Sequence, residues 1–151
     1  MPQSLAPVYL HIVFSTKDRK PFLESKETRQ RVFDYLGGIC HNHDCPPMEI
    51  GGVEDHTHIL CRFGRTISIA DLLMNLKRDS TKWIKAEFQE LNQFSWQAGY
   101  GAFSVSPGHL DALRAYIRNQ EEHHATVSFQ DELRRLCAKY GATIDERYAW
   151  D

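Results

Sequence analysis

The sequence predicts an α+β fold: a ferredoxin-like split β-α-β unit with a central antiparallel sheet and additional C-terminal helices. Strand-like runs rich in β-branched and aromatic residues alternate with helically spaced segments in the order β-α-β-β-α-β-α-α. No repeat, low-complexity segment or shift in composition marks a boundary, so residues 1–151 are expected to form one domain. We expect helices on one face of this sheet and a site on the other.

The composition is that of an ordinary soluble globular protein, with 42% hydrophobic and 25% charged residues. The net charge of −2 excludes a strongly basic protein, so any surface for nucleic acid must be local. The four cysteines form no C-x-x-C pair, and no secretory or membrane-spanning apolar run is present. These features predict a cytoplasmic protein with reduced thiols and no membrane partner.

The first half of the chain predicts three strands and one helix. The strand patterns cover residues 8–14, 48–53 and 56–63, and the helix pattern covers residues 25–40. A basic loop follows the first strand. Gly51-Gly52 allows the second and third strands to bend or to form a hairpin.

The second half begins with the longest helical pattern, over residues 67–91. A glycine-punctuated aromatic strand follows over residues 94–105. Ser106-Pro107 predicts the start of a helix that extends to His124, because serine caps free amides and proline fits the first helical position. A last amphipathic helix over residues 129–140 is closed by Gly141.

Two histidines separated by one residue lie in the third predicted strand. Because side chains alternate along a strand, His56 and His58 point to the same face and can converge on one divalent metal. By itself such a pair is more often structural than functional. Glu54 and Asp55 precede it and could either join the surroundings of the metal or only shape the turn.

A tyrosine and a glutamine lie one turn apart on the predicted helix that begins at Pro107. Tyr116 and Gln120 share one edge of this helix, beside its apolar stripe, and His123 lies near them. The Gln120 amide oxygen can bind a hard cation. The Tyr116 hydroxyl can attack a phosphate whose charge such a cation neutralises. His123 could assist proton transfer or simply end the helix in solvent.

These motifs resemble those of a known family. Asp55-His56-Thr57-His58-Ile59-Leu60 looks like the motif of HUH endonucleases, and Ala115-Tyr116-Ile117-Arg118-Asn119-Gln120 resembles the tyrosine helix of single-tyrosine HUH transposases. The segments 94–101 and 128–151 are similar to that family too. Its members include the transposases of the smallest insertion sequences and REP-associated tyrosine transposases. Thr57 departs from the usual bulky apolar residue, which affects packing more than metal binding.

The resemblance implies a mechanism on single-stranded DNA. His56, His58 and Gln120 would hold one Mg²⁺ or Mn²⁺ on the cleaved phosphate, and Tyr116 would form a 5′-phosphotyrosine intermediate that a 3′-hydroxyl later resolves. The resemblance also implies recognition of DNA hairpins and a homodimer in which subunits can share active sites. Asp55, Glu54 and His123 would then surround the metal ligands without binding the metal themselves.

Two groups of basic residues are candidates for DNA binding, although a charged stripe is more often just a solvated face. They are Arg78, Lys82 and Lys85 on the long helix, and Lys17, Arg19 and Lys20 in the loop after the first strand. A nearly neutral protein that binds DNA must gather positive charge locally.

Three alternatives stay open at this point. Cys40-His41-Asn42-His43-Asp44-Cys45 contains zinc-type ligands, but its spacing fits no zinc ribbon or finger. The protein could also be a domesticated hairpin-binding protein or host HUH nuclease without transposition. Finally, a metal-bound water could hydrolyse the phosphodiester without any covalent intermediate.

Overall fold

The computed structural model of the chain describes residues 3–151 and contains one four-stranded sheet. The strand order is β2-β3-β1-β4, and every neighbouring pair is antiparallel. The strands are β1 (Tyr9–Ser15), β2 (Pro47–Val53), β3 (His56–Arg62) and β4 (Gly101–Val105). This topology is the split β-α-β arrangement, with the histidine strand β3 at an inner position, so the predicted fold class is confirmed.

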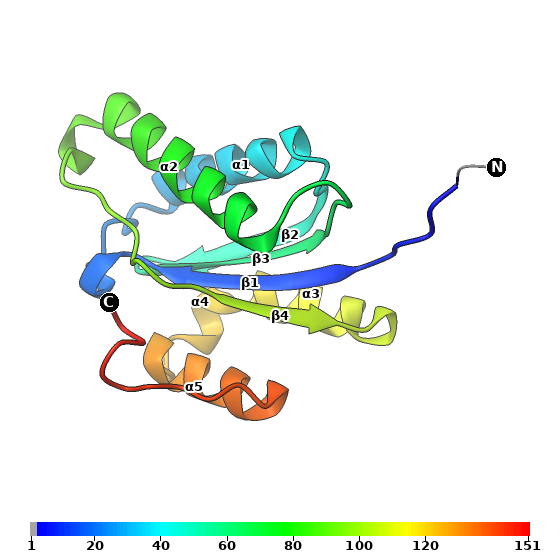
Figure 1. Cartoon of the computed structure of the whole chain (residues 1–151). Helices are drawn as coiled ribbons and strands as arrows, with labels where there is room; N and C mark the ends of the chain where they lie inside the picture. Colours follow the sequence, from blue (N-terminus) through cyan, green and yellow to red (C-terminus); the bar gives the residue numbers. More distant parts are fainter. Residues whose placement is uncertain (1–2) are drawn as a thin grey trace.

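Helices cover both faces of the sheet (Figure 1). One face carries α1 (Lys26–Asn42) and α2 (Ile69–Glu87); the other carries α3 (Leu110–Arg118), α4 (Gln120–His123) and α5 (Phe129–Tyr140). Short 3-10 turns lie at η1 (Lys17–Arg19), η2 (Gln89–Leu91) and η3 (Pro107–His109). Within residues 3–151, no helix is both long and apolar enough to span a membrane.

The expectation that one sheet face stays free of helices is wrong. Phe129 and Leu133 of α5 form a small apolar core with Val13 and Phe103 of the sheet. Burial of these side chains stabilises α5 on that face, because the apolar stripe of an amphipathic helix must leave water. The histidine face is therefore an interior layer between the sheet and α3–α5.

Strand alternation separates the two layers. Leu10, Ile12 and Phe14 of β1 belong to the larger core beneath α1 and α2, whereas His11 and Val13 face the opposite layer. On β3 the same alternation gives Ile59 and Cys61 to the larger core and leaves His56 and His58 on the other side. The Thr57 hydroxyl bonds the carbonyl of Gly51 and faces away from the two histidines, as the sequence predicts.

The helix ends agree with the sequence at most positions. Ser25, Ser68 and Ser128 accept hydrogen bonds from the amides of Thr28, Asp71 and Asp131 respectively, so each serine caps its helix. Gly141 closes α5 in the left-handed conformation. Ser106 is different: its hydroxyl contacts Nδ1 of His109 rather than a free amide.

The predicted helix from Pro107 to His124 is interrupted. Residues 107–109 are a 3-10 turn, and Asn119, with φ −95° and ψ 22°, separates α3 from α4. Tyr116 therefore lies at the end of α3, whereas Gln120 begins α4. The two side chains still reach the same site, because Asn119 is the only residue between the end of α3 and the start of α4.

The predicted strand over residues 94–105 is also shorter than expected, because only 101–105 pair with β1. The preceding segment is irregular and satisfies its polar groups in other ways. The Gln97 side chain accepts a hydrogen bond from the amide of Ser15, and Nζ of Lys77 lies within hydrogen-bond distance of the carbonyls of residues 97–99. Two backbone bonds, from the Gln97 amide to the Ser15 carbonyl and from the Lys17 amide to the Ser95 carbonyl, act with these side-chain contacts where no continuous ladder forms.

Two close contacts hold the second helical layer to the sheet. A Cβ at Gly51 would lie 2.5 Å from the carbonyl oxygen of Ile117, so the glycine lets α3 approach β2 directly. At the C-terminus, the guanidinium groups of Arg19 and Arg134 lie 6.0 and 5.0 Å from the centre of the Trp150 ring. The end of the chain therefore returns to η1, as Figure 1 shows.

Candidate metal and tyrosine site

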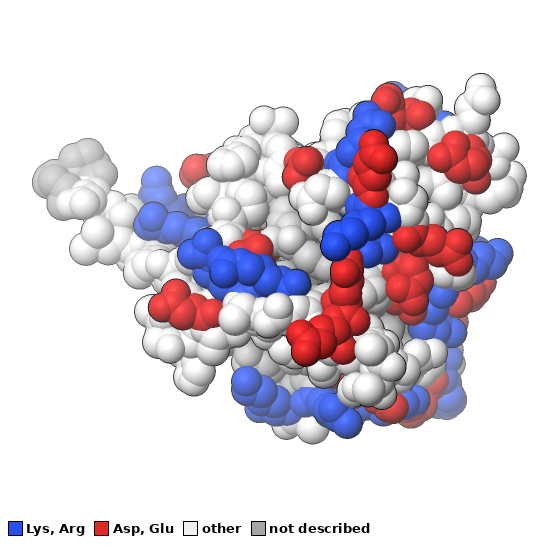
Figure 2. All heavy atoms as spheres, turned by 180° about the vertical axis from the view of Figure 1, so that it is seen from behind, with Lys and Arg blue, Asp and Glu red and all other residues white. Residues whose placement is uncertain are grey.

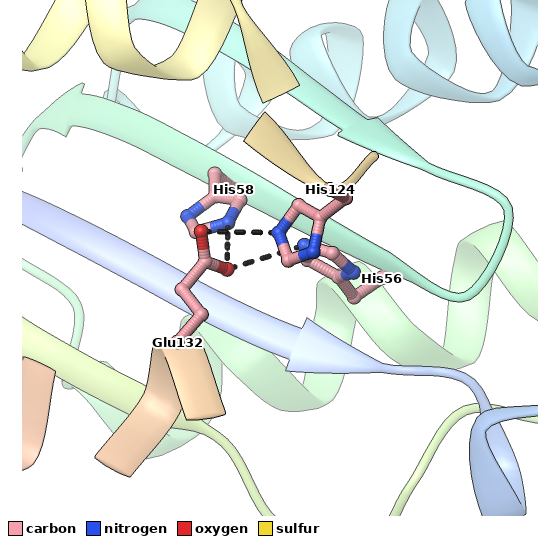
Figure 3. Close-up of side chains that lie close together, drawn as sticks. All are labelled: His56, His58, His124 and Glu132. Atoms are coloured by element: carbon pink, nitrogen blue, oxygen red, sulfur yellow. Dashed lines mark hydrogen bonds and ion pairs between the residues drawn. The ribbon is translucent and has the colours of Figure 1, made fainter. Parts of the chain in front are cut away.

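His56 and His58 lie side by side on β3 and are fully buried under α3–α5. Their ring centroids are 5.1 Å apart. Both rings approach one carboxylate oxygen of Glu132 from α5: Oε1 is 2.8 Å from Nε2 of His58 and 3.3 Å from Nε2 of His56. Figure 3 shows the carboxylate directed toward both rings.

Gln120 joins this pair from the start of α4. Its side chain is 1% exposed, and its Oε1 lies 3.1 Å from Nε2 of His56. Its amide nitrogen donates to Oε2 of Glu132 at 3.2 Å. The three side chains predicted as metal ligands, from two different elements, therefore come together in one buried place.

The Tyr116 hydroxyl reaches the same place from α3. It donates a hydrogen bond to Oε2 of Glu132 and lies 3.3 Å from Nε2 of His123. The tyrosine ring meets the His58 ring edge-on, with centroids 5.9 Å apart. Tyrosine and histidines thus converge within a single chain, and His123 lies beside the hydroxyl as expected.

Glu132 and His124 are members of this site that the sequence reasoning missed. Ligand atoms of His56, His58, His124 and Glu132 all lie within 4.8 Å of one another (Figure 3). A usable signal existed for Glu132: it falls on the apolar stripe of α5 beside Phe129 and Leu133, and a charge there needs partners. For His124 no comparable signal existed, because it follows the last turn of α4.

Two further residues orient the histidines from behind. Oδ1 of Asp55 lies 2.7 Å from Nδ1 of His56, and Nε2 of His11 lies 2.8 Å from Nδ1 of His58. Such contacts fix the tautomer and direction of a ligating ring. Asp55 was a predicted supporting residue, whereas His11 was not. Glu54 is exposed at the turn between β2 and β3, so the structure does not bring it to the site.

The site has strongly shifted protonation equilibria. Burial alone would raise the pKa of Glu132, but the imidazoles of His124, His56 and His58, whose nitrogens lie within 3.3 Å of its carboxylate, hold that pKa well below its ordinary value. Burial opposes the charged form of His56, yet Asp55 and Glu132 raise the pKa of His56 to about 9. For His58 burial prevails and lowers the pKa. An ionised carboxylate thus faces one charged and one neutral imidazole.

Tyr116 is held in its phenol form by the same surroundings. Burial raises the pKa of its hydroxyl, and the hydrogen bond to the charged Glu132 raises it further. The phenol must therefore lose its proton to a partner, or the local charge must change, before the oxygen can act as a nucleophile.

The donor set fits a divalent metal ion. Imidazole nitrogens from His56 and His58 lie with the Gln120 amide oxygen and the Glu132 carboxylate around one point. In addition, the buried Nε2 of His124 is 3.1 Å from Glu132 without forming a well-directed hydrogen bond. A buried nitrogen without a good partner is what a metal ligand looks like when only protein atoms surround it.

The predicted DNA-binding residues lie away from this site. Arg78, Lys82 and Lys85 are exposed on α2, which covers the opposite face of the sheet. Arg78 also bonds the side chains of Asn75 and Asp79. The second group lies in and beside η1, where Arg19 packs against Trp150. Neither group surrounds Tyr116.

Basic residues near the tyrosine come instead from α5, where Arg135 and Lys139 line a cavity that Tyr116 also lines. On the face seen from behind, Figure 2 shows Lys and Arg atoms interleaved with Asp and Glu atoms. The charge on that face is mixed, in keeping with the small net charge of the chain.

The rival zinc cluster does not form. Cys40 and Cys45 are buried in the larger core, whereas His41 is exposed at the end of α1. In the part of the chain that the structure describes, the group of His56, His58, His124 and Glu132 is the one arranged to hold a metal ion.

Comparisons with known proteins agree with this architecture. The fold is similar to that of a presumed transposase from Deinococcus radiodurans R1, with a TM-score of 0.64 and 22% identity over 80% of this chain and 96% of that one. It is also similar to a REP-associated tyrosine transposase bound to a REP hairpin, with a TM-score of 0.61 and 9% identity over 84% of this chain and 74% of that one. No curated protein sequence matches significantly.

A family model adds evidence from the sequence itself. The model described as "Transposase IS200 like" matches residues 4–120, a stretch that runs from before β1 to Gln120. It includes both histidines and Tyr116 but ends before α5, so Glu132 lies outside the matched region. The resemblance predicted from the motifs is thereby confirmed: this chain belongs to the IS200-like transposase family.

Proposed function

We propose that this transposase cleaves and rejoins single-stranded DNA through a covalent bond between Tyr116 and a 5′-phosphate. One observation carries the proposal: the Tyr116 hydroxyl bonds the same carboxylate, Glu132, that contacts both His56 and His58. A phosphate held at the histidines would therefore lie beside the tyrosine oxygen.

The covalent step exchanges one phosphoester bond for another. The Tyr116 oxygen forms a bond to phosphorus, and the bond between phosphorus and the 3′ oxygen of the preceding nucleotide breaks. The tyrosine proton passes to Nε2 of His123, which lies 3.3 Å from the hydroxyl. The departing 3′ oxygen takes a proton from solvent. Rejoining reverses these events with a 3′-hydroxyl from another strand, so no external energy source is needed.

We assign His56, His58 and Gln120 as ligands of one Mg²⁺ or Mn²⁺, with Glu132 and His124 as further candidates. When bound, the metal would neutralise charge on the phosphate oxygens and polarise the phosphorus. Asp55 and His11 would keep the two imidazoles in place, and His123 would hold the Tyr116 hydroxyl in its direction of attack.

We propose a DNA hairpin as the recognised partner, because one of the structures with a similar fold is bound to a REP hairpin. We also propose a homodimer, as the family resemblance implies. Lys17 and Lys20 beside η1, together with the α2 residues Arg78, Lys82 and Lys85, are candidates to contact the hairpin stem, since they are exposed and remote from Tyr116.

The test is a search for the covalent intermediate. Wild-type protein, labelled single-stranded DNA carrying a hairpin, and Mg²⁺ or Mn²⁺ are incubated and analysed on a denaturing gel. We expect a DNA-linked protein band that is absent with Tyr116→Phe and retained with Tyr148→Phe, a change at an exposed tyrosine near the C-terminus. Tyr116→Phe should still bind the hairpin.

The raised pKa of Tyr116 gives one alternative a specific basis, because a protonated phenol is a poor nucleophile and a metal-bound water could attack instead. Cleavage that survives Tyr116→Phe without any linked band would establish that hydrolase. Binding without cleavage by the wild type would instead indicate a domesticated hairpin-binding protein.

A further inference from the structure

A cavity of about 370 Å³ lies between α3 and α5, directly beside the site. Tyr116 forms one part of its wall, and apolar side chains such as Val105, Leu113 and Leu136 line much of the rest. Its volume falls in the range of small-molecule sites, which combine apolar walls with a few polar groups.

One of those polar groups has no partner. His11 is fully buried, lines the cavity and uses Nε2 to contact His58, while its Nδ1 makes no hydrogen bond. A buried ring nitrogen without a partner is costly, so a ligand in the cavity could supply the missing bond.

Nδ1 is the ring atom of His11 that is left to bond a group held in the cavity, because Nε2 is taken by His58. An imidazole nitrogen either accepts or donates a hydrogen bond. The edge of a nucleic-acid base carries both donors and acceptors, so it can supply the missing partner.

We propose that this cavity binds the base of a nucleotide next to the cleaved phosphate, with Nδ1 of His11 hydrogen-bonded to the edge of that base. The inference rests on the proposed function and adds a source of sequence preference to it. A phosphate attacked by Tyr116 must lie at the tyrosine end of the cavity, so an adjacent base is the ligand group within closest reach.

Other parts of the wall suit a nucleotide. Tyr140 lines the cavity and is stacked on Phe103 with centroids 4.9 Å apart, which gives a fixed aromatic surface for a base. Arg135 and Lys139, one turn apart on α5, line the same cavity and can pair with phosphates on either side of the base. An apolar ligand without phosphate would offer no anionic partner to either basic side chain.

The first experiment measures binding in EDTA, so that it does not depend on cleavage. The probes are the four deoxynucleoside 5′-monophosphates, purine deoxyriboside 5′-monophosphate, which differs from dAMP only in lacking the amino group, and deoxyribose 5-phosphate. Calorimetry or NMR titration should show preference for a base over deoxyribose phosphate. We expect the affinities for the different bases to differ by about two- to tenfold, the usual effect of one hydrogen bond.

Variants locate the binding. Ala112 is exposed on α3 and lines the cavity, so Ala112→Trp should fill its mouth without disturbing the core and should weaken nucleotide binding about tenfold or more. Ala138→Trp, at an exposed position of α5 outside the lining, is the matched control and should bind as wild type. His11→Phe should remove the hydrogen bond to the base and so reduce the difference in affinity among the bases.

Three results would overturn the base pocket. They are equal affinity for deoxyribose phosphate and every nucleotide, unchanged affinity in Ala112→Trp, and differences among the bases that persist undiminished in His11→Phe. Equal weakening by the two tryptophan variants would also refute it, since binding would then not be local to the cavity.

A second arm separates this inference from the proposed function. Wild type and Ala112→Trp are incubated with a randomised single-stranded DNA pool and metal, and covalently captured DNA is sequenced. Base bias next to the linked phosphate should be present in wild type and lost in Ala112→Trp. Capture with the same bias in both would refute the pocket and keep the tyrosine mechanism. Base-dependent binding in EDTA without any capture would keep the pocket and refute the mechanism.

Discussion

Tyr116 donates a hydrogen bond to Glu132, a residue of α5 that lies beyond the region matched by the family model. The contact joins the proposed nucleophile to the proposed metal ligands, because the same carboxylate lies 2.8 Å from His58. It also keeps the phenol protonated. The state of Tyr116 is therefore controlled by a side chain that the family motifs do not include.

Removing the charge of Glu132 should make Tyr116 easier to ionise. In Glu132→Gln the negative neighbour disappears, so the pKa of Tyr116 should fall toward the ordinary value of about 10. NMR of tyrosine labelled at the ring carbon that bears the hydroxyl would follow this titration. Glu122→Gln, at an exposed position of α4, should leave it unchanged. A Tyr116 titration that does not move in Glu132→Gln would contradict the control we describe.

Without metal, stability should fall as the pH rises from about 6.5 to 9. The pKa of His56 is raised to about 9 in the folded chain, so its contribution is fully present below its unfolded value and is lost as pH rises through the folded one. The loss is at most about 3 kcal/mol, from about 1.4 kcal/mol per pKa unit. Urea unfolding in EDTA across this range measures it.

The control for this pH effect is a pair of asparagine variants. His56→Asn should flatten the dependence of the unfolding free energy on pH, whereas His41→Asn, at an exposed position, should keep it. Equal slopes in both variants would show that the pH dependence arises elsewhere.

Gln120→Ala should weaken metal binding rather than DNA binding. Its amide oxygen lies 3.1 Å from Nε2 of His56, inside the donor set, and far from the exposed basic residues of α2. We expect affinity for Mn²⁺ to drop about tenfold or more, with hairpin binding unchanged. Calorimetric titration with Mn²⁺ and a gel-shift assay measure the two separately. A metal titration identical to that of Gln89→Ala, an exposed control, would remove Gln120 from the ligands.

Gly51→Ala should displace α3 from the sheet. The added Cβ would lie 2.5 Å from the carbonyl oxygen and 2.9 Å from a methyl group of Ile117, and the backbone oxygen cannot rotate away. We expect a destabilisation of about 1–3 kcal/mol and a loss of covalent DNA linkage, because Tyr116 adjoins Ile117. Thermal unfolding and the denaturing gel measure these effects.

Gly38→Ala is the matched control for that substitution. A Cβ at Gly38 meets nothing within 4 Å, and the residue lies inside α1, so alanine should stabilise the protein by about 0.5–1 kcal/mol. A Gly51→Ala protein as stable and as active as Gly38→Ala would show that α3 does not depend on this close approach.

Local patterns in the sequence predicted the fold and the two residue pairs at the centre of the site. Alternation along β3 was enough to pair His56 with His58, and helical spacing was enough to pair Tyr116 with Gln120, even though Asn119 breaks the helix between them. Both are short-range relations that the backbone period imposes. That the two pairs meet came only from the family resemblance.

The residues that surround these two pairs reach the site through contacts between distant segments of the chain. His11 and Glu132 are separated by most of the chain, and each meets His58 only because β1 pairs with β3 and α5 packs on Val13 and Phe103. No spacing rule predicts such meetings. The helical layer over the histidines was missed for a related reason: an apolar helix stripe indicates that a helix is covered, but not which surface covers it.

The close approach of Gly51 to Ile117 also bears on how this protein can evolve. Glycine is the only amino acid without a Cβ, so every missense change in the Gly51 codon adds atoms against the α3 backbone. Gradual change at this position is therefore not available, and a lineage that keeps the tyrosine helix against β2 must keep glycine or rebuild the helix junction. A deep mutational scan for DNA linkage should show an intolerant position here, at a strand residue whose close contact is with the backbone of α3.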